Sequence, residues 1–331
     1  MDFLSNTYNA LRTPQGAPQT PADTIKRLSD RLSPATLLAD RRASVLALKG
    51  LVREWKQDVS ENALHGLLGV LENDAELDGD IAKAVLETLN ALCDASDNGP
   101  DSKFLGLANT DEVLKTSMPV EKLLSLLGDS AFYVRFSSLQ LMGTLLYNRR
   151  QQVQAYFLKT HSAPGAVLGI LEEKREILRN GASNLVWFYC SRFSHNTIEG
   201  LNIIQSLISN NPDIQKVFAF EGAFEKLFNI VRTENGVDGG IIVQDCFACI
   251  DGLLRLNNSN QTFFRETGFA GFLTSLVFFP SNLHPQEPAP QEFSLQFWDT
   301  QKTANVSLLV DILGILVGSK GSNVSVKLVT G

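Results

Sequence analysis

The chain has 331 residues, of which 44% are hydrophobic, and a formal net charge of −7. This length and apolar content are sufficient to bury a large core, either as one elongated domain or as two ordinary ones. The acidic balance argues against a nucleic-acid-binding surface, which needs a basic stripe. The four cysteines are unevenly spaced and form no disulfide framework in a chain this long, so we expect a reducing compartment.

The N-terminal residues 1–22 are rich in Pro, Gln, Thr and Ala, and this composition predicts a flexible tail. Asp2 and the scattered apolar residues around it do not form a signal peptide. The run from Thr20 to Asp23 resembles a capped helix start with Pro21 at the first helical position. A helical domain is therefore expected from about residue 23.

Apolar side chains spaced three, four or seven residues apart predict three helices in the next part of the chain, over residues 38–59, 64–71 and 81–92. Residues 74–80 and 95–117 are predicted to be linkers, the second because it contains a turn-forming run at 97–100. No segment alternates convincingly between apolar and polar residues. The predicted fold class is all-α.

A four-residue pattern, Gln-x-x-Phe, recurs after three apolar helical segments, each time following a break that contains asparagine. The three copies pair Gln154 with Phe157, Gln215 with Phe218, and Gln261 with Phe264. A recurring unit of this size indicates an armadillo-like helical repeat solenoid, in which stacked helices bury a continuous core. We expect the three phenylalanines to occupy equivalent buried positions.

The middle repeat is longer than the other two by about one helix, which predicts an insertion. We place it at residues 181–198, an aromatic-rich run in which no helical stripe is visible, and expect an ill-packed excursion there. Two interpretations stay open for this run. It is either the product of a retained intron or a genuine surface loop.

Candidate chemical sites are few and incomplete. Cys246 and Cys249 have metal-ligand spacing, but no second pair or nearby histidine completes a zinc site, so two core thiols are expected. The histidines are scattered, and Gly239 and Gly240 lack the strand that precedes a phosphate loop. The apolar stretch 306–317 contains Asp311 and is too short to span a bilayer. We expect no enzymatic activity, no cofactor, no metal and no transmembrane segment.

Four longer runs indicate a particular protein family more specifically than the repeat pattern does. They are residues 36–49, 218–227, 238–245 and 257–264. Together they resemble the globular head of the vesicle-tethering general vesicular transport factor family, in its fungal form. The resemblance covers residues 23–323, is interrupted at 181–198, and leaves 324–331 as a tail outside the family pattern. It implies an armadillo-like head that lacks the coiled coil of the family, and so a truncated chain.

The resemblance also implies a function. The expected role is non-enzymatic vesicle tethering in ER-to-Golgi protein transport, with docking and fusion at Golgi membranes. The implied partners are Rab-type GTPases, golgins, tethering complexes and SNARE proteins, together with a second copy of the chain as a homodimer. The implied location is the cytoplasm, peripheral on Golgi membranes and transport vesicles.

Charged and amide residues within the family-like runs are the candidate protein-interaction surface: Asp40, Arg41, Arg42, Lys49, Glu221, Glu225, Asp238, Asp245, Asn257 and Asn260. The alternative function is a generic armadillo adaptor that binds extended peptides along a groove. The three tryptophans do not recur at the repeat period, which counts against an adaptor. A third hypothesis, an unrecognised enzyme, would need a well-formed pocket with perturbed titratable groups.

Overall fold

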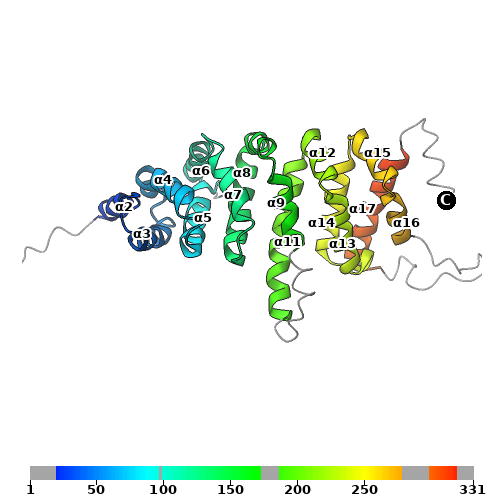
Figure 1. Ribbon diagram of the computed structural model, residues 1–331, viewed down its shortest axis with the longest axis horizontal. Helices are drawn as coiled ribbons and strands as arrows, with labels where there is room; N and C mark the ends of the chain where they lie inside the picture. Colours follow the sequence, from blue (N-terminus) through cyan, green and yellow to red (C-terminus); the bar gives the residue numbers. More distant parts are fainter. Residues whose placement is uncertain (1–19, 97–98, 173–185, 278–297, 319–331) are drawn as a thin grey trace, which may run out of the picture. The chain divides into compact units, whose positions relative to one another are not determined.

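The computed structural model describes residues 20–96, 99–172, 186–277 and 298–318. The chain divides into two compact units, Met1–Pro119 and Val120–Gly331. All regular elements of the described residues are helices, so the all-α prediction is confirmed (Figure 1). The predicted tail lies outside this part of the chain except for residues 20–22, and the tail at 324–331 lies outside it entirely.

The first unit holds helices α2 (Pro21–Asp30), α3 (Leu38–Leu51), α4 (Lys56–Asn73), α5 (Gly79–Cys93) and α6 (Pro100–Val113). The predicted cap of α2 is confirmed, because the Thr20 side chain accepts a hydrogen bond from the Asp23 amide. α4 packs on α2, α5 and α6, and α3 packs on α5. The core between them is aliphatic, with Leu48, Leu67 and Leu89 fully buried.

Two sequence predictions for this unit are wrong. The helix expected over 38–59 is two helices, because the chain turns at residues 52–55 while the spacing of its apolar residues continues across the turn. The linker expected over 95–117 contains α6. The buried face of α6 carries Asn109 and Thr110, so no apolar stripe marks this helix in the sequence. Gly106 lets α6 approach the end of α5 closely, since an added Cβ would lie 2.4 Å from the Asp94 carbonyl oxygen.

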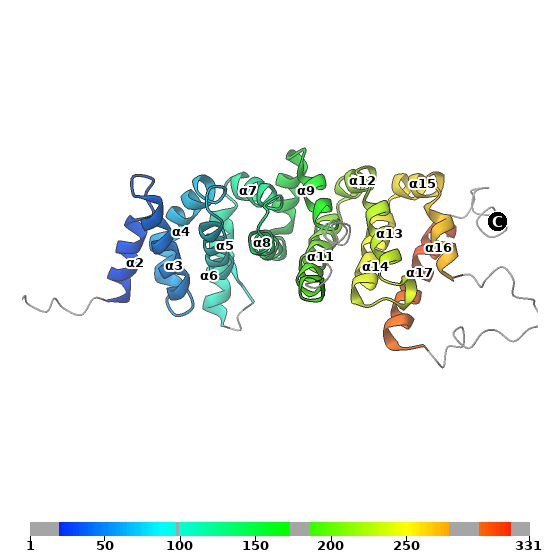
Figure 2. The same cartoon turned by 60° about the horizontal axis from the view of Figure 1, so that its bottom comes forward.

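α7 (Met118–Leu126) starts at the boundary between the units, and the second unit continues as a series of helices. They are α8 (Phe132–Lys159), α9 (Ala163–Ile170), α11 (Val186–Ile208), α12 (Pro212–Phe220), α13 (Ala223–Thr233), the short 3-10 helix η1 (Gly236–Asp238), α14 (Ile241–Leu254), α15 (Asn258–Glu266), α16 (Phe269–Val277) and α17 (Thr300–Val317). The long helices α8, α11, α14 and α17 pack in that order, each against the next (Figures 1 and 2).

A short helix follows the long helices α11 and α14, and the same backbone devices recur at these two junctions. Asn211 caps α12 and Asn257 caps α15, each by accepting a hydrogen bond from a main-chain amide in the first turn of the helix. Gly222 and Gly268, with φ of 84° and 82°, follow α12 and α15 respectively. In α8 the junction is a kink at Arg149, which separates a long from a short helical segment.

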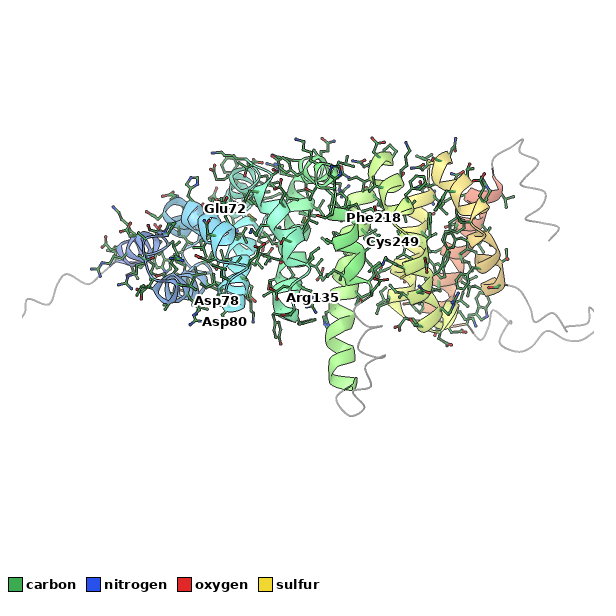
Figure 3. All side chains as sticks on the ribbon, viewed as in Figure 1. Glu72, Asp78, Asp80, Arg135, Phe218 and Cys249 are labelled. Atoms are coloured by element: carbon green, nitrogen blue, oxygen red, sulfur yellow. The ribbon has the colours of Figure 1, made fainter. Side chains whose placement is uncertain are left out.

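The repeated phenylalanines are buried as predicted. Phe157 is 1% exposed, and Phe218 and Phe264 are fully buried, all three in the short helical segments (Figure 3 labels Phe218). The rings of Phe157 and Phe218 stack with centroids 5.5 Å apart. The Gln-x-x-Phe pattern therefore marks one structural position in successive units.

The segment 181–198 differs from the prediction where the structure describes it. α11 starts at Val186, and it extends beyond the lower ends of its neighbours in Figure 1. The described part of the segment is helical, although its sequence shows no helical stripe, and Asn196 and Thr197 at its end are buried. The packing of the aromatic side chains at 187–193 lies outside the described residues. As in α6, polar residues on the buried face interrupt the apolar stripe, so the sequence pattern does not predict this helix. Residues 181–185 lie outside the described part of the chain.

α17 is longer than the apolar stretch at 306–317, and Gly318 follows its last residue. Within the described residues it is the one helix long and apolar enough to pass the criteria for a membrane span. Core helices of water-soluble proteins pass the same criteria. α17 carries Asp311 and buries Leu309, Ile312 and Leu316, and it packs on α14 and α16.

Candidate protein-interaction surface

The glutamine of each Gln-x-x-Phe pattern is buried and joins parts of the stack to one another. Its side-chain amide donates to backbone carbonyls at the C-terminal end of a long helix or just beyond it, where helices leave such groups unpaired. The acceptors are Leu207 and Ser209 for Gln154, Ile208 and Gly252 for Gln215, and Leu254 for Gln261. The repeated glutamine thus has a structural role.

Asn257 and Asn260 are part of the same buried network and do not belong to an interaction surface. Asn257 Nδ2 donates to the Gln215 side-chain oxygen over 2.9 Å, and Asn260 Nδ2 donates to the Gln215 carbonyl over 3.0 Å. Both asparagines are at most 4% exposed. The prediction that they contact a partner is therefore wrong, because their amides fix α15 against α12.

The candidate cations of the first unit are also engaged internally. Arg41 makes two 2.7 Å hydrogen bonds to Asp74, which raise the pKa of its guanidinium group. Three further ion pairs join α3 to the start and the middle of α5: Arg42 with Asp78, Arg42 with Asp80 (both acids are labelled in Figure 3), and Lys49 with Glu87. These cations hold α3 against its neighbours. Asp40 is the exposed residue of this candidate group.

The four candidate acids of the second unit lie on different elements. Glu221 caps the C-terminal end of α12 and Glu225 lies in the first turn of α13, and both are exposed. Asp238 pairs with Lys302 of α17 at 2.7 Å. Asp245 is half-buried on α14, where burial raises the pKa of its carboxyl group. The structure therefore brings Glu221 and Glu225 to one turn and separates them in the fold from Asp238 and Asp245.

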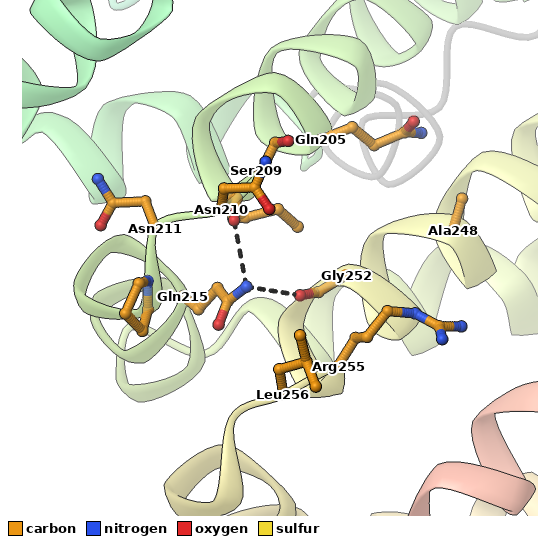
Figure 4. Close-up of a pocket in the computed structure, with 11 residues that line it drawn as sticks. Gln205, Ser209, Asn210, Asn211, Gln215, Ala248, Gly252, Arg255 and Leu256 are labelled. Carbon is orange, nitrogen blue, oxygen red and sulfur yellow. Dashed lines mark hydrogen bonds between the residues drawn. The ribbon is translucent and has the colours of Figure 1, made fainter.

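A groove of roughly 500 Å³ lies between the α11–α12 turn and the α14–α15 turn (Figure 4). Two of its polar side chains, Gln215 and Arg255, are already paired. Gln215 donates to two carbonyls, and Arg255 makes two hydrogen bonds of 2.6 and 2.8 Å to Asp251. Arg255 is the titratable side chain of this lining, and the Asp251 carboxylate raises its pKa. The groove offers no acid–base pair, which does not support the enzyme hypothesis.

A second groove, of about 430 Å³, lies over the exposed side of α12 and α15. Phe220, the last residue of α12, is 64% exposed, and its ring lies 5.1 Å from the ring of Phe263. Glu266 lines the same groove. None of the candidate residues named from the sequence lies in this groove. The sequence does indicate an outward-facing aromatic residue here, because Phe218 and Phe220 lie two residues apart and cannot share one face of a helix.

Cys246 and Cys249 are core residues, as predicted. Cys246 and Cys249 are fully buried on α14 (Figure 3 labels Cys249), and burial raises the pKa of both thiols. Burial also raises the pKa of Cys93 to about 12. Thiols with raised pKa values are poor nucleophiles and poor metal ligands at neutral pH. In the part of the chain that the structure describes, no group of His, Cys, Asp and Glu could hold a metal ion.

Comparison with known proteins agrees with this helical architecture, although no model of a known protein family matches the chain. The chain is 32% identical to the human general vesicular transport factor p115 over 324 residues, which are 96% of this chain and 30% of that protein. It is 27% identical to the intracellular protein transport protein USO1 of Saccharomyces cerevisiae over 338 residues, which are 93% of this chain and 17% of that protein.

Comparison with solved structures also finds a likeness to this group of transport proteins. A crystal structure of Uso1 superposes with a TM-score of 0.74 at 26% identity, over 92% of this chain and 46% of that one. A designed armadillo repeat protein superposes with a TM-score of 0.52 over 87% of this chain and 99% of its own. At 14% identity, that second likeness bears on the fold alone, and it confirms the armadillo-like prediction.

The helical repeats and these relatives define a repeat protein of the vesicular transport class. The chain belongs to the general vesicular transport factor family, which includes p115 and Uso1. Animal and fungal members match it at similar identity. This family of transport factors is not enzymatic. The chain spans 30% of the length of the p115 relatives.

Proposed function

We propose that this chain is a tethering head in intracellular vesicle transport and acts by binding trafficking proteins. The observation that carries the proposal is the match to p115 over 96% of the chain, on a fold that presents helical surfaces and no catalytic constellation among its described residues. In this proposal the chain acts in ER-to-Golgi transport, where vesicles dock and fuse at Golgi membranes. The chain is placed in the cytoplasm, peripheral on Golgi membranes and vesicles.

The proposed partners are Rab-type GTPases, golgins, tethering complexes and SNARE proteins, and a second copy of the chain. Exposed residues that make no internal ion pair are the ones available to them. Of the candidate residues, Asp40, Glu221 and Glu225 meet that condition in the described part of the structure. Arg41, Arg42 and Lys49 do not, because ion pairs within the first unit occupy them.

The peptide-adaptor alternative has less support. An armadillo adaptor uses a ladder of amide side chains to bind the backbone of an extended peptide. In this chain the repeated amides are turned into the stack, where Gln154, Gln215 and Asn260 donate to helix carbonyls. The adaptor hypothesis is therefore not retained.

A binding panel tests the proposed function. The purified chain is titrated by biolayer interferometry against a Rab-type GTPase in its GTP-bound and GDP-bound forms, a golgin, a tethering-complex subunit and the cytosolic part of a SNARE. Saturable binding of at least one partner, with a Kd in the range of about 1–10 μM or tighter, is expected. Serum albumin serves as the control. If no member of the panel binds better than albumin, the proposed function is wrong.

A further inference from the structure

The groove over α12 and α15 has no role in the fold that would account for its aromatic side chains. Phe220 is 64% exposed, although Phe218 and Ala219 beside it are buried and already fix α12 against its neighbours. Phe263 is partly exposed, with its ring 5.1 Å from that of Phe220 and 6.5 Å from that of Phe224. Paired, exposed aromatic rings of this kind are typical anchor points of protein–protein interfaces.

The surroundings of this aromatic pair are negative. Glu221 follows Phe220 directly and Glu266 lines the groove, and both carboxylates are exposed. In the part of the chain that the structure describes, neither makes an ion pair. Other carboxylates of the unit, such as Asp213 and Asp238, have basic partners. These two are therefore available to a cation on a binding partner.

The backbone adds to this negative potential. α12 ends at Phe220 and α15 ends at Glu266, so the C-terminal ends of both helices lie by the aromatic pair. A helix C-terminus carries about half a negative charge, which favours a cation. Lys216, one turn before Phe220 on α12, pairs with Asp213 at 3.6 Å. Arg265 precedes Glu266 directly, and its guanidinium group donates to the Leu316 carbonyl of α17 over 2.7 Å. Arg265 is therefore turned towards α17.

We infer that this groove binds a segment of a partner protein in which lysine or arginine alternates with large apolar side chains. The apolar side chains pack on Phe220 and Phe263, and a basic side chain lies over the rings while it pairs with Glu221 or Glu266. An acidic or purely apolar segment would not fit, because the first is repelled and the second leaves both carboxylates without a partner. This inference rests on the proposed protein-binding function and specifies the chemistry of one partner.

A peptide titration with surface variants tests the inference. The probe is a synthetic amphipathic peptide with only Arg and Lys on one face and Leu on the other, and its counterpart carries Glu in place of every Arg and Lys. The basic peptide is expected to bind the wild-type chain at least about tenfold more tightly than the acidic one. Raising the salt concentration from about 50 to about 300 mM should weaken this binding.

Each variant at the groove has a matched control elsewhere on the surface. Phe220→Ser, and separately the pair Glu221→Lys with Glu266→Lys, should each weaken binding of the basic peptide about tenfold. Phe104→Ser on α6, where the ring is 76% exposed, and Glu121→Lys on α7 should leave it unchanged. Circular dichroism should give the same helix content for all variants, since the substituted side chains are exposed.

Equal binding of the two peptides, no binding of either, or groove variants that bind like the wild type would overturn the inference. Its failure is distinguishable from failure of the proposed function. If the binding panel succeeds and the peptide titration fails, the partner uses another surface. If the peptide binds as expected and the panel fails, the groove is a basic-peptide site outside vesicle transport.

Discussion

Replacing Phe218 by alanine tests whether the repeated phenylalanine holds the stack together. The side chain is fully buried and stacks on Phe157 across neighbouring repeats. Removing a buried phenylalanine ring costs about 3–5 kcal/mol, because apolar burial is lost and a cavity remains. The cost of Phe218→Ala should lie in the upper part of that range, because the stacked aromatic pair itself contributes about 0.5–1.5 kcal/mol. For a unit of this size, about 4 kcal/mol lowers the melting temperature by about 8–16 °C.

The assay is urea unfolding followed by circular dichroism, with Phe220→Ala as the matched control. Phe220 lies two residues away on the same helix and is 64% exposed, so its truncation should change the free energy of unfolding by less than about 0.5 kcal/mol. If Phe218→Ala is no more destabilising than Phe220→Ala, the Gln-x-x-Phe pattern does not mark a core position. The interpretation of the repeat would then be wrong.

Three further variants or treatments test other parts of the account. Gln215→Ala should destabilise the chain by about 2–4 kcal/mol, because the Ile208 and Gly252 carbonyls lose their buried partner; a change below about 1 kcal/mol in urea unfolding would contradict this. Asp245→Asn should raise the unfolding midpoint at pH 7. Burial raises the pKa of Asp245 in the fold, so the native state is penalised as the pH rises through that pKa, and the gain should vanish below about pH 3.8. Cys246 and Cys249 should resist alkylation at pH 8 until the chain unfolds; rapid labelling of their peptide in the native state, measured by mass spectrometry, would contradict their burial.

The repeat could be predicted from the sequence because its key residues are apolar and recur in one pattern. Phe157, Phe218 and Phe264 follow a glutamine at the same distance, and all three are buried. The helices that escaped prediction lack that signal. α6 and the middle of α11 bury polar residues such as Asn109 and Asn196, and a polar residue in the core looks like a surface residue in the sequence.

The candidate surface was predicted less well, for a related reason. A charged or amide residue has the same sequence signature whether it meets solvent, a partner or a neighbouring helix. Arg41 is bound by Asp74 and Asn260 by α12 and α14, and these contacts depend on residues far away in the chain. Phe220 could be assigned to the outer face only once it was known which side of α12 faces the core. The burial of Phe218 establishes that side.

Retention of transport vesicles on the immobilised chain tests the central claim most directly. Beads that carry the purified wild-type chain are incubated with ER-derived vesicles and cytosol, and bound vesicles are counted by a fluorescent cargo. The account predicts clear retention by the wild type and by Phe104→Ser, and retention lower by about tenfold with Phe220→Ser. Wild-type beads that hold no more vesicles than bare beads would contradict the account.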